Sequence, residues 1–269
     1  MIDTHCHLTF PDFAGRAQAE LDLCERHDVT GVVTISTTSR DCVNALAIAE
    51  SDPRVWCSAG VHPLYADQGP HDWEAIRRCA RSDRCVAWGE LGLDNHYDRP
   101  ASNLQHAVLA EQLAVIEDSA VEGGASGYGK PIIIHCREAF DDLLPVLAAS
   151  SLRPDRFVFH CFTGSAEDVR RVLDFGAMVS LTGVVTYKNA KDVQSAAKLI
   201  PIERLMVETD APFLSPVPHR GDRPCRPWMV SATARFLADL RGEPFEIFHA
   251  AINANTERFF GIEQARGRS

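Results

Sequence analysis

Short apolar, β-branched segments recur along the chain, and each is followed by a stretch whose apolar residues have helical spacing. Eight segments are typical of buried strands: residues 2–7, 29–37, 55–62, 85–94, 131–136, 157–162, 178–183 and 205–210. In the stretches between them, apolar residues recur three and four positions apart, as on one face of an amphipathic helix. These stretches predict helices over residues 14–26, 40–50, 72–81, 103–121, 138–149, 166–175, 191–199 and 231–240, and a last helix over 245–260.

The strict alternation of strands and helices indicates how the sheet is built. Strands joined by crossover helices run parallel, because each helix returns the chain to the same edge of the sheet. Eight such units in 269 residues favour a closed (β/α)8 TIM barrel over an open doubly wound sheet. The length would also fit two smaller domains, but no linker divides the chain. We therefore expect a single domain over residues 1–269.

Two connections depart from the compact pattern. Residues 121–130 are rich in glycine and predict an enlarged surface loop before the fifth strand. Residues 211–227 contain five prolines and follow the eighth strand. Loops after barrel strands often carry function, so the second connection is a candidate for shaping a site.

Composition and charge exclude several classes of protein. The chain is 45% hydrophobic and 24% charged, as is typical of globular proteins, and no apolar run reaches the roughly 18 residues of a membrane span. The formal net charge of −10 excludes a protein that coats nucleic acid by bulk electrostatics, so any nucleic acid must be met locally. Nine cysteines without a C-x-x-C pair, and no visible signal peptide, predict reduced thiols and a cytoplasmic location.

Histidines and acidic residues gather where the predicted strands end. Because the carboxyl ends of parallel barrel strands converge on one face, these side chains are expected to meet there. Imidazole and carboxylate groups together suit divalent metals such as Zn, Mn or Mg. The residues in question are Asp3, His5, His7, His62, Glu90, Asp94, His135, Arg137, His160, Glu208 and Asp210.

Strand alternation gives the first histidines a common direction. Residues two apart on a strand point to the same face, so His5 and His7 can bind one ion. Taken alone, the pair could equally be a polar strand edge. The further residues Glu90, His135, His160 and Asp210, each ending another strand, favour a metal site, because burying so many unpaired polar groups is costly.

The cysteines beside these histidines are expected to have no metal-binding role. Cys6, Cys136 and Cys161 each adjoin a proposed ligand histidine, so alternation should turn them outward into the helix layer. We interpret them as small core residues.

Other polar residues near the strand ends are candidates for substrate contact. His62 ends the third strand and could contact a phosphate, although a lone histidine is more often structural. Arg137 could bind a phosphate through its planar donor fork or form an ion pair at a helix start. Arg220, Arg223 and Arg226 border the proposed site in the long eighth loop, where a charge run could also be solvated surface.

Six motifs in order resemble the TatD family of metal-dependent deoxyribonucleases, within the amidohydrolase-like barrels. They are Ile2-Asp3-Thr4-His5-Cys6-His7, Gly60-Val61-His62-Pro63, Gly89-Glu90-Leu91-Gly92-Leu93-Asp94, Ile134-His135-Cys136-Arg137, His160-Cys161-Phe162-Thr163-Gly164 and Glu208-Thr209-Asp210-Ala211-Pro212. The resemblance runs from Ile2 to Pro212, with a weaker match over residues 220–260.

The resemblance implies a two-metal hydrolase that cleaves phosphodiester bonds in DNA. His5 and His7 would hold one divalent ion (Mg, Mn or Zn), with Asp210 completing that site. His135 and His160 would hold the other ion, and Glu90 would bridge the two. Asp210 would also act as the general base toward a metal-activated water.

Two other functions are compatible with the same residues. Two-metal barrels also hydrolyse amides and other esters, since fold does not fix function. A non-catalytic metal-binding scaffold is a third reading, although every proposed ligand and the base are present.

The sequence departs from the family pattern at three places. Asn95 stands where the family usually has tyrosine, and Cys225-Arg226-Pro227 stands where an asparagine usually precedes the proline. The stretch between Gln112 and Pro131 is longer than usual. None of these changes touches a proposed ligand, but each could alter the substrate.

Overall fold

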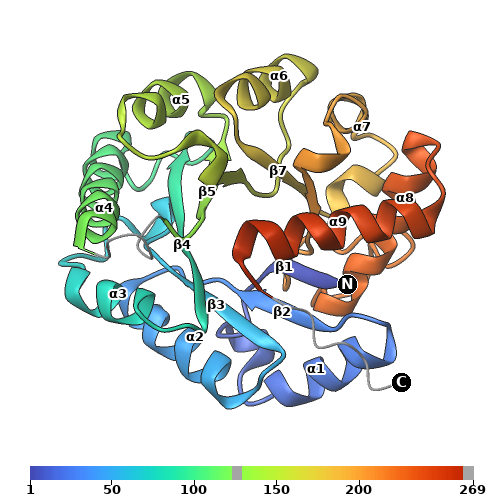
Figure 1. Ribbon diagram of the computed structural model, residues 1–269, viewed down its shortest axis with the longest axis horizontal. Coiled ribbons are helices and arrows are strands. Elements are labelled where there is room, and N and C mark those ends of the chain that lie inside the picture. Colours follow the sequence, from blue (N-terminus) through green and yellow to red (C-terminus); the bar gives the residue numbers. More distant parts are fainter. Residues whose placement is uncertain (123–128, 263–269) are drawn as a thin grey trace.

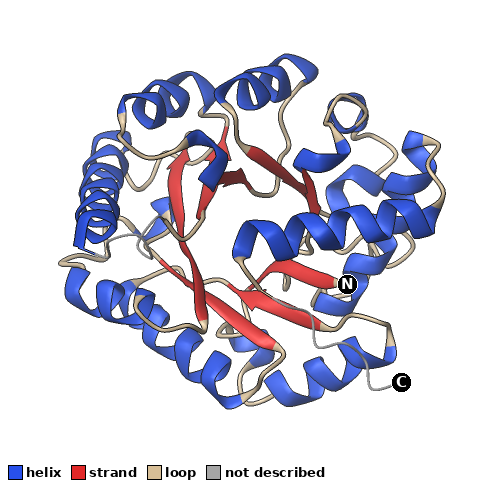
Figure 2. Cartoon of the chain, viewed as in Figure 1, coloured by secondary structure: helices blue, strands red, loops and turns tan. Residues whose placement is uncertain are grey.

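Eight parallel strands form one sheet in the computed structural model, which describes residues 1–122 and 129–262 (Figures 1 and 2). The order in the sheet is the order in the sequence, from β1 to β8. The strands are β1 (Ile2–Cys6), β2 (Gly31–Thr34), β3 (Val55–Ala59), β4 (Cys85–Asp94), β5 (Ile132–Arg137), β6 (Phe157–Phe159), β7 (Met178–Leu181) and β8 (Leu205–Val207). The helices are α1 (Ala17–Arg26), α2 (Ser39–Ser51), α3 (Trp73–Ala80), α4 (Ser102–Glu122), α5 (Phe140–Ala149), α6 (Ala166–Phe175), α7 (Lys191–Ala197), α8 (Val230–Arg241) and α9 (Phe245–Phe260).

The segment after β8 closes the sheet into a barrel. The N–H of Asp210 donates to the carbonyl of His5 at 2.8 Å, and the N–H of His7 donates to the carbonyl of Ala211 at 2.7 Å. A parallel bridge joins Cys6 to Ala211. The (β/α)8 TIM barrel expected from the alternating pattern is thus confirmed, and the closing backbone hydrogen bonds involve Asp210 and Ala211, just beyond β8.

Side chains alternate between the barrel interior and the helix layer. Val33, Ile133, Val158 and Met206 belong to an inner cluster, whereas their strand neighbours belong to the outer core that packs on the helices. Phe259, at the end of α9, joins the inner cluster, and α9 crosses the barrel mouth (Figure 1). The helix expected over residues 245–260 therefore packs back onto the barrel, where it covers one mouth and leaves the carboxyl ends of the strands free.

Local sequence signals set several helix ends. Thr38 and Asp72 accept backbone N–H bonds at the starts of α2 and α3. Ser165 and Asp168 form a reciprocal capping box at the start of α6, which ends at Gly176 in the left-handed conformation. None of the described helices combines the length and apolarity needed to cross a bilayer.

Several strands are shorter than the sequence pattern predicts. The pattern placed strands over 29–37, 157–162 and 205–210, but β2, β6 and β8 end earlier, and their last predicted residues form the loops of the site. At these positions the backbone leaves the sheet and turns toward the cavity. The loop expected over 121–130 lies mostly outside the described residues, and its first two residues belong to α4.

Candidate metal centre

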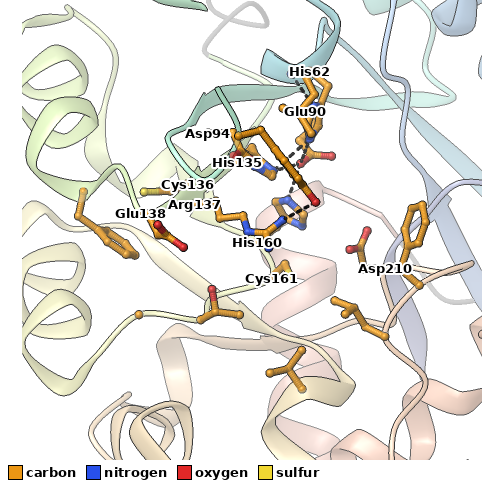
Figure 3. A pocket seen from close by; sticks show the side chains of 18 of the residues that line it. His62, Glu90, Asp94, His135, Cys136, Arg137, Glu138, His160, Cys161 and Asp210 are labelled. Atoms are coloured by element: carbon orange, nitrogen blue, oxygen red, sulfur yellow. Dashed lines mark hydrogen bonds and ion pairs between the residues drawn. The ribbon is translucent and has the colours of Figure 1, made fainter. Parts of the chain in front are cut away.

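The proposed ligands meet in a cavity of about 890 Å³ at the carboxyl ends of the strands. Its lining includes His7, His62, Glu90, Asp94, His135, Arg137, His160 and Asp210. Figure 3 shows Glu90 among His62, His135 and His160, with Asp210 on the opposite side of the cavity from Glu138. The proposed metal ligands, His62 and Arg137 therefore lie in or beside one cavity.

A bulge in β4 turns Glu90 into the barrel. Between Trp88 and Leu91 the strand uses one residue more than β5, which breaks simple alternation at Glu90. Gly89 takes φ +108° there, and a Cβ on it would lie 2.5 Å from the carbonyl oxygen of Ile133. Only glycine fits this position, so the Gly89-Glu90 pair is needed to aim the carboxylate.

A second bulge, in β1, turns His5 inward, together with His7 one residue beyond the strand. Residues Asp3 to Cys6 face only Val32 to Thr34 of β2, one residue fewer. Asp3 then points away from the cavity and accepts hydrogen bonds from the N–H and the hydroxyl of Thr209, at 2.9 and 2.6 Å. This clamp holds β1 against the segment after β8, and Asp210 follows at φ +61°.

Glu90 is the centre of the cluster. Its side chain is 2% exposed, and one oxygen, Oε1, lies 2.7 Å from Nδ1 of His135 and 2.6 Å from Nε2 of His160. The other oxygen, Oε2, lies 3.2 Å from Nε2 of His5. Asp210 likewise faces two histidines: its Oδ1 lies 3.2 Å from Nε2 of His7 and 3.6 Å from Nε2 of His5.

The second ring nitrogen of three histidines already has an acceptor. Nδ1 of His7 faces the carbonyl of Ile35 at 3.1 Å, Nε2 of His135 faces Asp94 at 2.9 Å, and Nδ1 of His160 faces Glu208 at 3.2 Å. In the neutral ring each of these nitrogens must carry the proton. The nitrogen that points at Glu90 or Asp210 is then a lone pair facing a carboxylate.

Between such a nitrogen and a carboxylate, either a ring proton or a metal ion must supply positive charge. His5 adds to this requirement: neither of its ring nitrogens, in a fully buried side chain, makes a hydrogen bond. Such groups are costly to bury unpaired. A divalent cation would satisfy both partners, and outer acceptors such as Asp94 and Glu208 commonly orient ligand histidines. The residues present therefore fit a metal.

The pKa shifts have the same origin. Burial alone would raise the pKa of Glu90, but the surrounding imidazoles, His160 first among them, hold it well below its usual range. Burial opposes a charged His160, yet Glu90 and Glu208 raise its pKa well above the ordinary value. Asp94 and Glu90 likewise raise the pKa of His135 against burial, and Asp210 raises that of His7. Acceptors on both sides of a ring thus favour positive charge at that position, which a ring proton or a bound metal ion supplies.

His62 differs from these histidines. Its Nδ1 accepts the backbone N–H of Leu64 at 3.0 Å, so the proton of the neutral ring must sit on Nε2. That N–H points at Oε1 of Glu90, 3.2 Å away. Burial lowers the pKa of His62 to about 4, which keeps the ring neutral. Although it lies within ligand distance of Glu90 and His135, His62 is therefore a hydrogen-bond donor rather than a lone-pair ligand.

The three cysteines beside the proposed ligand histidines do not all point in the expected direction. Cys6 lies in the outer core, as alternation predicts. Cys136 also packs in that core, but it lines the cavity as well, so its expected outward direction holds only in part. For Cys161 the expected outward direction is wrong: the residue takes φ +43°, and it lines the cavity. Its strand has already ended at Phe159, so alternation no longer applies.

Of the arginines proposed to contact substrate, only Arg137 is among the residues described as lining the cavity. Arg137 lines the cavity, with its guanidinium 5.1 Å from the ring centre of Tyr97. The cluster of Arg220, Arg223 and Arg226 lies outside the residues described as lining it. Arg220 packs over Tyr187 at 4.2 Å instead, and Arg226 faces Glu20 at 3.8 Å.

Some residues of the site carried no clear signal in the sequence. The positions of Asp94 and Glu208 at strand ends were visible, but their role as partners of His135 and His160 was not. Phe10, Tyr97 and Phe213 line the cavity from loops, where neither periodicity nor a motif distinguishes them.

Comparison with known families supports the metal centre. The profile of the family described as TatD related DNase matches residues 2–261. The chain belongs to this TatD family. The uncharacterized metal-dependent hydrolase YcfH of Escherichia coli K12 is 32% identical over all of this chain and 98% of that protein.

Two further relatives extend the comparison. A protein of Enterobacter lignolyticus named 3'-5' ssDNA/RNA exonuclease TatD is 30% identical over 97% of this chain and 99% of its own length. The crystal structure of YjjV, a TatD homologue from Escherichia coli K12, superposes with a TM-score of 0.88 at 29% identity, covering 98% of both chains. The chain is thus a metal-dependent hydrolase of the TatD type.

Proposed function

We propose that this TatD-family protein is a deoxyribonuclease that hydrolyses phosphodiester bonds with the help of two divalent ions. The observation that carries the proposal is the set of imidazole nitrogens that face the carboxylates of Glu90 and Asp210. His5, His7 and Asp210 would hold one ion, His135 and His160 the other, and Glu90 would contact both. When bound, Mg, Mn or Zn ions polarise a phosphoryl group and lower the pKa of water.

The chain supplies the proton acceptor. The Asp210 side chain is 15% exposed, so its carboxylate can reach a water in the cavity. Burial opposes its ionisation, but His7 and His5 lower its pKa below the ordinary value. Asp210 is therefore ionised near neutral pH and acts as the general base that takes the proton from the attacking water.

The chain also supplies groups that hold the phosphate. The Nε2–H of His62 is a donor with its direction fixed by Leu64, and it serves a phosphate oxygen beside Glu90. Arg137 offers a planar guanidinium at the end of β5, two residues beyond His135, and binds the same phosphate. Both groups act only locally, in keeping with the acidic net charge of the whole chain.

We further propose that residues 1–269 act as one domain in the cytoplasm. All nine cysteines are free thiols, in agreement with a reducing compartment.

The proposal is tested by comparing substrate classes. Purified protein is treated with a chelator and then assayed with Mg, Mn and Zn added separately. The substrates are single-stranded DNA, double-stranded DNA, and a panel of small amides and carboxylic esters. We expect metal-dependent cleavage of DNA. Cleavage of amides or carboxylic esters alone would overturn the deoxyribonuclease assignment, and the absence of any hydrolysis would favour a metal-binding scaffold.

A further inference from the structure

Two phenylalanines form one rim of the cavity, beside His7. Phe10 stacks on the ring of His7, with centroids 4.6 Å apart and 22° between the planes. Phe213 meets Phe10 edge-on at 6.0 Å and His7 at 6.4 Å. Phe213 is 45% exposed although it is fully apolar, so the loop after β8 holds an aromatic surface open to the cavity. We call Phe10 and Phe213 the phenylalanine rim.

A tyrosine forms a second rim, beside His135. Tyr97 is 50% exposed, with Arg137 stacked 5.1 Å from its ring centre and the His96 ring edge-on at 4.9 Å. It also lines a smaller adjoining hollow with Leu64, Asp98 and Arg99. We call Tyr97 and Arg137 the tyrosine rim.

The segment that carries Tyr97 is held in place. Asn95 donates to the carboxylate of Asp142 at 2.8 Å and to the carbonyl of Glu138 at 3.3 Å. His96 pairs with the Glu138 carboxylate at 2.8 Å. Asn95 and His96 thus fasten the loop to the start of α5 and fix the position of the Tyr97 side chain that follows.

The two rims flank the proposed ions. The phenylalanine rim touches His7, the partner of Asp210, whereas Arg137 belongs to β5, which also supplies His135. Figure 3 shows Asp210 and Glu138 on opposite sides of the cavity, with the Glu90 cluster between them. The volume of about 890 Å³ is near the upper end of the roughly 300–1,000 Å³ common for small-molecule sites.

We propose that the two rims are base-binding subsites that hold the nucleobases on either side of the scissile phosphate. The inference rests on the proposed phosphodiester hydrolysis and adds its substrate specificity. Exposed aromatic faces take bases of any sequence by stacking, and the arginine beneath Tyr97 strengthens that stack. Only unpaired bases offer free faces for such stacking.

The test uses a thymidine dinucleotide and two analogues that lack one base each, on the 5' or the 3' side of the phosphate. Methyl 4-nitrophenyl phosphate serves as a small diester without a nucleobase. Tyr97→Ala and Phe213→Ala are compared with Tyr97→Phe, which keeps the ring. Ile247→Ala is the matched control, because Ile247 is 66% exposed on α9 at the other mouth of the barrel.

Each alanine variant is expected to raise KM for the dinucleotide about 5- to 100-fold, the range given by base–aromatic stacking, with little change in kcat. KM for the small diester should not change, and Ile247→Ala should behave as wild type. Tyr97→Phe, which keeps the stacking ring, should keep KM for the dinucleotide well below that of Tyr97→Ala. Removing one base should abolish the effect of one alanine variant, and removing the other base should abolish the effect of the second.

Three results would overturn the two subsites: wild-type KM in both alanine variants, equal losses on the dinucleotide and the small diester, or a response of both variants to the same missing base. If the wild type cleaves no diester, the proposed function fails instead. Calorimetric binding of a methylphosphonate-linked dinucleotide then still tests the rims, because that measurement needs no cleavage.

Discussion

At the scale of single residues, the second nitrogen of each histidine decides what that side chain can do. His7, His135 and His160 each give one N–H to an acceptor and turn a lone pair toward a carboxylate. His62 has the reverse arrangement and turns an N–H inward. Residue type alone does not separate these roles, so they follow from the neighbours Ile35, Asp94, Glu208 and Leu64.

The change Asp210→Asn tests the general base. Asparagine keeps the shape and one ligand oxygen but cannot take the proton, so turnover should fall about 10²- to 10⁴-fold. Most of the bound metal should remain, because four histidines and Glu90 are intact. Elemental analysis and the phosphodiesterase rate measure the two effects, and Glu90→Gln should lose metal from both positions. Near wild-type turnover in Asp210→Asn at saturating metal would make the assignment wrong.

His62→Gln tests the role of a donor against that of a ligand. Loss of a hydrogen bond to a charged phosphate should reduce kcat/KM about 10- to 100-fold. The metal content should equal that of the wild type, whereas His135→Ala should lose metal. A His62 variant that loses metal as fully as the His135 variant would show that His62 is a ligand.

At the scale of elements, strand alternation predicted where most of the site lies. His135 and His160 follow inner residues of β5 and β6 at even spacing, so they point inward as expected. The bulges in β1 and β4 could not be predicted, because an extra residue depends on pairing with the neighbouring strand. Cys161 could not be placed for a related reason: β6 ends two residues earlier and its backbone turns.

The loops set a further limit on prediction. Asp210 was expected at the end of a strand, yet it lies three residues beyond β8 and reaches the cavity through a left-handed turn. Its motif identified it, whereas Tyr97 and Phe213 have no motif and depend on how their loops fold over the barrel. The positions of the proposed ligands were therefore predictable from strand ends and resemblance, but the cavity rims were not.

Gly92→Ala tests the close strand approach beside Glu90. Gly92 takes φ +148°, and an added Cβ would overlap the carbonyl oxygen of His135. We expect the free energy of unfolding to fall by about 2–5 kcal/mol from strain and overpacking together. Gly242→Ala is the matched control: its φ is +70° with nothing within 4 Å, so only about 1–2 kcal/mol of backbone strain applies. Equal losses in urea denaturation would contradict the steric argument.

At the scale of the whole molecule, the two mouths of the barrel differ in what fills them. Phe259 and Phe260 of α9 pack with Val33 and Met206 in the inner cluster, so one mouth is filled by apolar side chains. The other mouth holds carboxylate and imidazole groups that suit a divalent cation. Stability should therefore depend on metal, since binding to the folded state alone stabilises it.

Metal removal should lower the melting temperature. At a free metal concentration 100 times Kd, binding contributes about 2.7 kcal/mol, which corresponds to a shift of roughly 5–10 °C for a domain of this size. Calorimetry with and without a chelator measures the shift, and the Glu90→Gln variant should show little of it. Identical melting temperatures in the wild type would mean that the clustered groups bind no ion.

The most direct test of the metal centre follows bound metal and rate together. Chelator-treated protein is titrated with Mn²⁺ while a single-stranded oligonucleotide is hydrolysed and bound metal is counted at each step. We expect no cleavage without metal and a rate that rises with occupancy until two ions are bound per chain. Full activity in the metal-free protein, or no cleavage at full occupancy, would contradict the proposed centre.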